Sequence, residues 1–164
     1  MFRLLVLLLL LTSTPALAQE LETVCNRSFQ VKYEVPAHWH VTRQRTDSVE
    51  VLRYHNPDNG ALLWVGQLRG QHAALRPALA LQRLLRHLGA VRHEEHNVTA
   101  HGLDFLESIG TCVLNGRELR YDARVTNVQG QQLLVHVYAV PVGFASKAPL
   151  LHYALENVTP LRSK

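Results

Sequence analysis

Apolar and polar residues alternate along several segments of the chain, which is the pattern of strands that bury only one face. In residues 28–35, every second residue is apolar: Phe29, Val31, Tyr33 and Val35. A second strand is predicted to start at Trp39, and others are predicted at 49–54, 61–68, 91–99, 103–114, 117–128 and 131–140. The pattern therefore predicts eight strands.

Turn-forming residues separate these strands. Residues 56–60 read Asn-Pro-Asp-Asn-Gly, and His101-Gly102 follows the fifth strand. Asn115-Gly116 is typical of a two-residue hairpin turn, and Gln129-Gly130 joins the last two strands. The strands are therefore expected to follow one another in hairpins, as in an antiparallel sheet.

Between the fourth and fifth predicted strands, the apolar residues follow the spacing of a helix instead of alternating. Residues 73–88 are rich in Ala, Leu, Arg and Gln, which favour helices, and Pro77 fits the first turn. An apolar stripe on this helix consists of Leu81, Leu84, Leu85 and Leu88. Gly89 is expected to end the helix, and a second helix is predicted at 149–157 after Ser146.

The resulting order is ββββαββββα, and it predicts an α+β domain. An antiparallel β-sheet of about six to eight strands would carry the two helices packed on it. The apolar runs and faces place Trp64, Leu84, Ile109 and Val135 in the core. We expect residues 28–158 to form this domain, with an N-terminal segment at 19–27 and a tail at 159–164.

The first eighteen residues are expected to be a signal peptide, not part of the fold. Arg3 is followed by the apolar run 4–11, which is far shorter than the ~20 residues of a membrane-spanning helix. Small residues precede a predicted cleavage site between Ala18 and Gln19. The protein is therefore expected to be secreted or periplasmic, with no membrane anchor.

Composition and charge agree with one folded domain and argue against nucleic-acid binding. The chain has 164 residues, of which 47% are hydrophobic and 18% charged. Its formal net charge is +4, and its basic residues form no run. Such mild, dispersed charge does not predict a nucleic-acid partner.

The order of elements and one short motif resemble the PsbP-like fold, also called the Mog/PsbP-like fold. The motif is the strand Phe29-x-Val31-x-Tyr33-x-Val35 followed by Pro36-x-x-Trp39. The resemblance extends over residues 28–158. It implies a binding or accessory role, because members of this family act by binding other proteins, and it implies no catalytic residues.

The two cysteines are predicted to form a disulfide. Both Cys25 and Cys112 follow the predicted cleavage site, and an even number of cysteines in an exported chain favours pairing. The alternative is two free thiols, one of them buried. We expect no chemistry from either cysteine.

Histidine is the unusual component of the chain, with ten residues. His38 and His40 would share a face of an extended segment, and His55 is a candidate third ligand for Zn²⁺ or Cu²⁺. A second group, 93–96 (His-Glu-Glu-His), would be split between the two faces of a strand. The alternative for both groups is a set of surface histidines.

No motif predicts an enzyme. The chain has no Gly-x-Ser-x-Gly sequence and no glycine-rich phosphate loop, and the adjacent Glu94 and Glu95 would point to opposite faces of a strand. We therefore expect a non-enzymatic binding or accessory protein of the cell envelope, without a cofactor. Its partner, a protein or another envelope component, is not specified by the sequence. The alternatives are a carrier of a small ligand or metal ion and an enzyme of unrecognised type.

Overall fold

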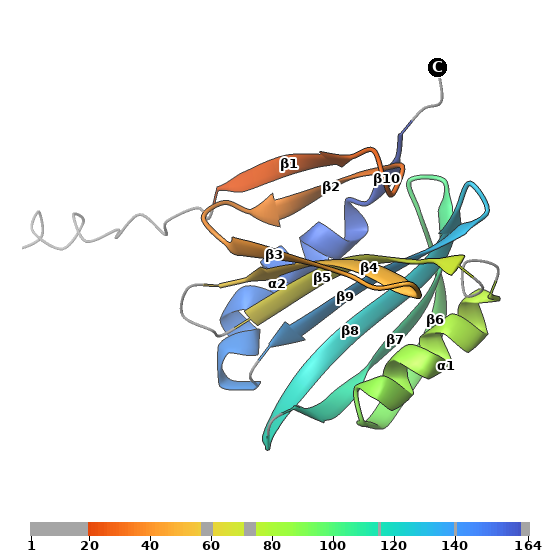
Figure 1. Ribbon diagram of the computed structural model, residues 1–164. Helices are drawn as coiled ribbons and strands as arrows, with labels where there is room; N and C mark the ends of the chain where they lie inside the picture. The colour runs from red at the N-terminus through yellow and green to blue at the C-terminus, as the bar shows by residue number, and fades with distance from the viewer. Residues whose placement is uncertain (1–19, 57–60, 71–74, 115, 140, 162–164) are drawn as a thin grey trace, which may run out of the picture.

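The structure is a computed structural model that describes residues 20–56, 61–70, 75–114, 116–139 and 141–161. The predicted signal peptide, residues 1–18, lies outside the described residues. Two sheets and two helices make up the described chain (Figure 1). The strands are β1 (Leu21–Asn26), β2 (Val31–Pro36), β3 (His40–Arg45), β4 (Val49–His55), β5 (Ala61–Leu68), β6 (Ala90–Ala100), β7 (Leu103–Leu114), β8 (Arg117–Val128), β9 (Gln131–Ala139) and β10 (Thr159–Pro160). The helices are α1 (Pro77–His87) and α2 (Pro141–Glu156).

The larger sheet is antiparallel and has seven strands in the order β3-β4-β5-β9-β8-β7-β6. Strands β6 to β9 form a meander of long hairpins. Two of its turns, His101-Gly102 and Gln129-Gly130, have positive φ at both residues, which is the type I′ geometry that suits strand twist. The α+β class and the antiparallel hairpins predicted from the sequence are confirmed.

The smaller sheet, with the order β1-β2-β10, was not predicted. Strand β1 lies in the segment 19–27, which we expected to precede the domain, and it pairs with β2 from Leu21 opposite Pro36 to Asn26 opposite Val31. The first predicted strand also starts later than expected. A turn occupies the residues before β2, in which the Phe29 amide donates a hydrogen bond of 3.0 Å to Asn26 Oδ1.

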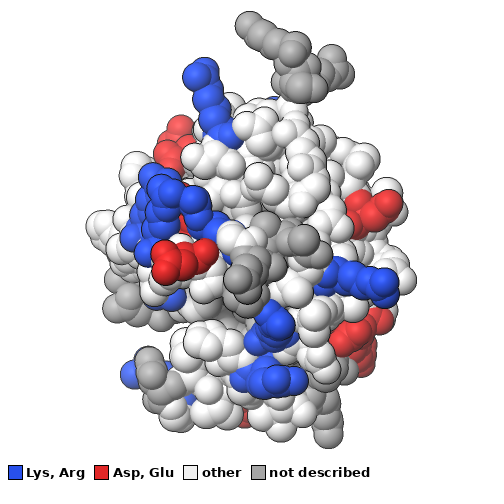
Figure 2. Space-filling model, turned by 45° about the vertical axis from the view of Figure 1, so that its right-hand side comes forward, with Lys and Arg blue, Asp and Glu red and all other residues white. Residues whose placement is uncertain are grey.

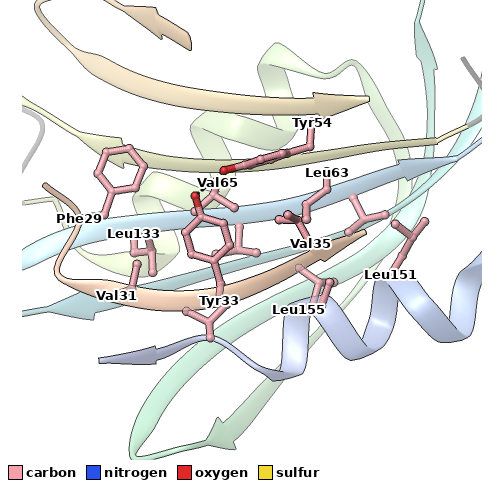
Figure 3. Packing of buried hydrophobic residues seen from close by; sticks show 14 of the residues in the cluster. Phe29, Val31, Tyr33, Val35, Tyr54, Leu63, Val65, Leu133, Leu151 and Leu155 are labelled. Carbon is pink, nitrogen blue, oxygen red and sulfur yellow. Dashed lines mark hydrogen bonds between the residues drawn. The ribbon is translucent and has the colours of Figure 1, made fainter. Parts of the chain in front are cut away.

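One hydrophobic cluster fills the space between the seven-stranded sheet, the small sheet and α2. It includes Phe29, Val31, Tyr33 and Val35 at alternate positions, as the sequence predicted. Figure 3 shows Leu151 and Leu155 of α2 among these side chains. The hydroxyl groups of Tyr33 and Tyr54 are hydrogen-bonded at 2.8 Å inside this cluster. Burial raises the pKa of both tyrosines, so they stay neutral.

A second cluster lies between α1 and the opposite face of the seven-stranded sheet. Leu81, Leu85 and Leu88 of the predicted stripe are buried there against Tyr121, Ala123 and other residues of β8. Gly89 has a φ of +61° directly after the helix, which agrees with its predicted role in ending it. The helix starts at Pro77, which confirms the prediction that this proline lies in its first turn.

Helix α2 differs more from the prediction. It begins at Pro141, whereas the sequence predicted a helix at 149–157, and Pro149 lies inside it. Within the residues that the structure describes, no helix is long and apolar enough to cross a membrane.

Candidate functional site

An open groove lies beside α1, on the same face of the sheet. Its volume is about 420 Å³, and it is lined by α1, by β4 and β5 and by Leu134 of β9. Seven strands spaced by about 4.8 Å make a sheet about 29 Å wide, whereas one helix is only about 10 Å wide. Helix α1 packs over β6, β7 and β8. The half of this face that belongs to β4 and β5 is therefore left open.

The floor of the groove is apolar. Val51 of β4 and the neighbouring strand's Trp64, Gly66 and Leu68 form it. A Cβ atom on Gly66 would lie 3.0 Å from Val51 Cγ2 and 3.2 Å from the carbonyl oxygen of Glu50. Glycine at this position therefore keeps the floor free of a side chain that would both enter the groove and collide with β4.

Basic groups line the walls of the groove. Arg53 lies with its guanidinium 4.7 Å above the Trp64 ring, a cation–π contact, and Arg83 and His87 come from α1. The Nε of Arg53 is buried and has no hydrogen-bond partner among the described residues. None of the described residues that line the groove is acidic. The groove therefore combines an apolar floor with a positively charged wall.

Elsewhere on the surface the positive charge is dispersed. In the view of Figure 2, Lys and Arg side chains form separate blue groups with uncharged surface between them. One arginine group surrounds Glu50, whose side chain is buried and accepts hydrogen bonds from Arg43 and, at 2.6 Å, from Arg69. Burial raises the pKa of Glu50, but these arginines and Arg45 outweigh it and hold that pKa below its ordinary value. The glutamate is therefore ionised and structural.

Two of the three histidines predicted to bind a metal ion lie together. His40 and His55 are directly opposite on β3 and β4, and their ring centroids are 5.3 Å apart. His38 is exposed in the turn before β3, with a φ of +66°. In the described part of the chain, no group of three His, Cys, Asp or Glu residues is arranged to hold a metal ion. The three-histidine site therefore stays a prediction, with only its cross-strand pair in place.

The predicted disulfide is not present in the structure. Cys25 is exposed on β1 in the small sheet, whereas Cys112 is buried on β7 in the cluster beneath α1, and both thiols are free. These strands belong to different sheets, so their order in the chain does not bring the two sulfur atoms together. Burial raises the pKa of the Cys112 thiol, which makes it less reactive.

Three of the four predicted core residues line cavities. Val135 is buried, with 1% exposure, but Trp64 and Leu84 are only half-buried because they line the groove. Ile109 is 36% exposed and lines a second cavity on the other face of the sheet. The prediction of burial is therefore confirmed for Val135, met only in part by Trp64 and Leu84, and wrong for Ile109, because the elements that would cover these side chains do not extend so far.

The chain matches no family model, and no curated protein is significantly similar in sequence. Solved structures are similar in fold. Cyanobacterial PsbP (CyanoP) from Synechocystis sp. PCC 6803 has a TM-score of 0.66 and 11% identity, over 92% of this chain and 98% of that chain. LpqN, involved in cell envelope biogenesis of Mycobacterium tuberculosis, has a TM-score of 0.53 and 15% identity, over 85% and 90%. A protein of unknown function from Pseudomonas aeruginosa has a TM-score of 0.55 and 14% identity, over 88% and 99%.

These similarities cover most of each chain and establish the fold. The protein has the PsbP-like fold, as the resemblance from the sequence implied.

Proposed function

We propose that this chain is an exported, non-enzymatic binding protein of the cell envelope, and that the groove beside α1 holds an amphiphilic envelope component with an anionic group. The groove is the observation that carries the proposal. Its volume of about 420 Å³ is within the range of roughly 300–1,000 Å³ that is usual for ligand pockets. Its lining combines apolar surface with a few polar groups, which is typical of such sites.

The apolar part of the ligand would lie against Trp64, Leu68 and Leu84. These side chains are only half-buried. An alkyl chain that covers them would remove apolar surface from water at both partners, which favours binding by about 25 cal/mol per Å². An apolar chain therefore fits the floor better than a polar ligand does.

The anionic part of the ligand would lie at the basic wall. Arg53 has a buried Nε that lacks an acceptor among the described residues, Arg83 adds positive charge from the helix, and His87 adds a ring that can donate a hydrogen bond. A carboxylate or phosphate oxygen supplies the missing acceptor, and bonds between charged groups are stronger than neutral ones. The absence of acidic groups from the described lining removes the repulsion that such an anion would otherwise meet.

Export and a place in the envelope are supported by two observations. Residues 1–18 have the charge, apolar run and small residues of a signal peptide. LpqN, one of the proteins with a similar fold, is involved in cell envelope biogenesis. Mass spectrometry of the exported protein tests the first observation, because cleavage after Ala18 leaves Gln19 as the first residue.

Calorimetric titration with three C12 compounds tests the ligand class. Dodecanoate, dodecanol and dodecylammonium share an alkyl chain and differ in charge. The two ions are used below their critical micelle concentrations, and dodecanol is used below its solubility limit. We expect dodecanoate to bind with a stoichiometry of one and about tenfold more tightly than dodecanol. We also expect a change in Trp64 fluorescence, since that ring forms part of the floor.

Matched variants of α1 locate the site. Arg83 lines the groove and the exposed Arg86 does not, so Arg83→Gln is expected to weaken dodecanoate binding and Arg86→Gln to leave it unchanged. Leu84→Asp is expected to abolish binding, whereas Leu79→Asp changes an exposed position outside the groove. Equal binding by Leu84→Asp and the wild type would contradict the proposal, as would the absence of binding by all three compounds.

A further inference from the structure

A second cavity lies on the opposite face of the sheet, between β7, β8 and α2. Its volume is about 320 Å³. Its walls are apolar where Ile109, Val137 and Leu155 line it, and its polar lining includes Asp122 of β8 and His152 of α2. It is separated from the groove beside α1 by the sheet itself, so it is a different site.

Asp122 is buried in this cavity without an adequate donor. The residue is 7% exposed, and its Oδ1 has no hydrogen-bond partner among the described residues. Its Oδ2 lies 3.6 Å from Nδ1 of His152, which is longer than a normal hydrogen bond. A buried carboxylate oxygen without a donor is costly, because it has lost its water and gained nothing in return.

The nearby arginine does not fill this role. Arg124 is 1% exposed, and its Nε and Nη2 both lie 2.6 Å from Oε1 of Glu107. Its Nε is 4.0 Å from Oδ1 of Asp122, too far for a hydrogen bond. The charge of Arg124 is thus balanced by Glu107, and the buried group of Glu107, Asp122 and Arg124 carries one excess negative charge when Asp122 is ionised.

We propose that the cavity beside α2 binds a small organic ammonium ion, whose N–H groups donate to Asp122 and whose apolar body contacts the apolar walls. An ammonium group supplies the hydrogen-bond donor that Asp122 lacks and balances the excess negative charge of the buried group. Bonds of this kind, between charged partners, are the stronger ones in proteins. The ligand is expected to have an apolar body because Ile109, a large apolar side chain, is left uncovered at the cavity and would be covered by it.

The site is expected to lose its ligand in mild acid. Burial and the neighbouring Glu107 raise the pKa of Asp122 to about 6, although Arg124 and His152 oppose this. Asp122 is therefore mostly ionised at pH 7.5 and mostly protonated at pH 5.0. The acid form cannot pair with an ammonium ion, so the affinity is expected to fall by about tenfold between these pH values.

Other charged groups face the same site and require a control. Arg120 lies on β8 at the cavity, and His152 contacts Glu156 at 3.2 Å as well as Asp122. Of these, His152 is the one whose side chain contacts Asp122 directly, at 3.6 Å. His152→Gln removes the imidazole and keeps an uncharged polar side chain. We expect the variant to keep the pH dependence of ammonium binding, since the dependence comes from Asp122.

Titration of the protein with 2-phenylethylamine, 2-phenylethanol and 3-phenylpropanoate tests the proposal. The three compounds share a phenyl body and differ in charge. We expect the amine to bind about tenfold or more tightly than the alcohol at pH 7.5, and the acid to bind weakest. Equal binding of the alcohol, tighter binding of the acid, or no binding of any of the three would overturn the proposal.

A matched pair of variants assigns the carboxylate. Asp122→Asn keeps the shape of the side chain and is expected to reduce amine affinity by about tenfold or more. Asp104→Asn makes the same change at an exposed position of β7 and is expected to have no effect. Unchanged amine binding by a folded Asp122→Asn variant would overturn the proposal. The three-compound series on the wild-type protein decides the question even if that variant fails to fold.

Discussion

The two faces of the seven-stranded sheet are closed to different extents. On one face, α2 and the sheet β1-β2-β10 pack on a continuous cluster of side chains from β4, β5, β9, β8 and the start of β7, and the smaller cavity at Ile109 interrupts this cover. On the other face, α1 alone covers β6 to β8, and the surface of β4 and β5 stays open as the groove. The comparison shows that alternation in a strand specifies which residues face inward. Whether they are covered depends on the elements that pack against that face.

The largest expected change in stability comes from truncating adjacent residues of β5 that point to the two different faces. Leu63 points to the closed face and is 1% exposed, whereas Leu62 points to the α1 face and is half-buried. Leu63→Ala is expected to lower the free energy of unfolding by about 2–5 kcal/mol, because it leaves a cavity. Leu62→Ala is expected to cost clearly less. Urea unfolding of both variants checks this, and equal losses would contradict the difference between the faces.

Two of the three carboxylates buried in the described chain, Glu50 and Asp122, are expected to respond to pH in opposite directions. Glu50 is surrounded by three arginines, and Glu50→Gln is expected to lower the free energy of unfolding by about 1–3 kcal/mol at pH 7. The pKa of Glu50 is lowered in the folded state, so its contribution is present above the ordinary value of 4.5 and is lost as the pH falls through the folded value. Unfolding at pH 7 and at pH 3 should therefore show that the difference between the wild type and the variant becomes smaller in acid.

Ionisation of Asp122 is expected to destabilise the folded state, whereas ionisation of Glu50 stabilises it. Its pKa of about 6 in the folded state is above the ordinary value of 3.8, so the folded state binds a proton that the unfolded state releases between these values. The stability of the wild type therefore falls as the pH rises through this range. Asp122→Asn is expected to raise the free energy of unfolding by about 1–2 kcal/mol at pH 7.5 and to give no gain below pH 4. A loss of stability at pH 7.5 in thermal unfolding would contradict this.

The smallest effect on stability is expected at the cysteines. Cys25 is exposed and Cys112 is buried, with 1% exposure. Cys25→Ser is expected to change the free energy of unfolding by less than about 0.5 kcal/mol, as at other surface positions. Ellman's reagent should modify one thiol of the unreduced folded protein rapidly and two after denaturation. No reactive thiol in the denatured, unreduced protein would show instead the disulfide predicted from the sequence.

The hairpins and α1 were predictable because their signals are local. The bounds of β5, β7 and β8 agree with the prediction, since alternation and glycine turns are read from neighbouring residues. Strand β1 was missed because its residues are mostly exposed or half-buried and show no apolar face of their own. It is a strand because β2 pairs with it. Helix α2 was placed too late because the residues at its start follow a predicted strand and have no helical signal of their own.

The two cavities could not be predicted for the same reason. Trp64 and Ile109 have the apolar character of core residues. Nothing near them in the sequence shows that Trp64 borders the groove beside α1 and Ile109 the cavity beside α2. Asp122 lies between apolar residues that face the cluster beneath α1. The alternation along β8 therefore predicts that Asp122 points to the opposite side of the strand, into solvent. Helix α2 covers that face and buries the carboxylate, with His152 thirty residues later in the chain than Asp122.

The small sheet joins residues from both ends of the described chain, and this affects the order in which the protein can fold. Strand β2 pairs with β1 on one side and with β10 on the other, where Thr159 is opposite Lys32 and the Leu161 amide donates a hydrogen bond of 2.8 Å to the carbonyl of Gln30. Contacts between residues so far apart form slowly, because a long loop must close first. During synthesis, β2 therefore lacks its second neighbour until residue 161 has left the ribosome. Leu151, Leu155 and Val158 of the same cluster also lie near the end of the described chain, so the core on this face is completed only when synthesis is almost finished.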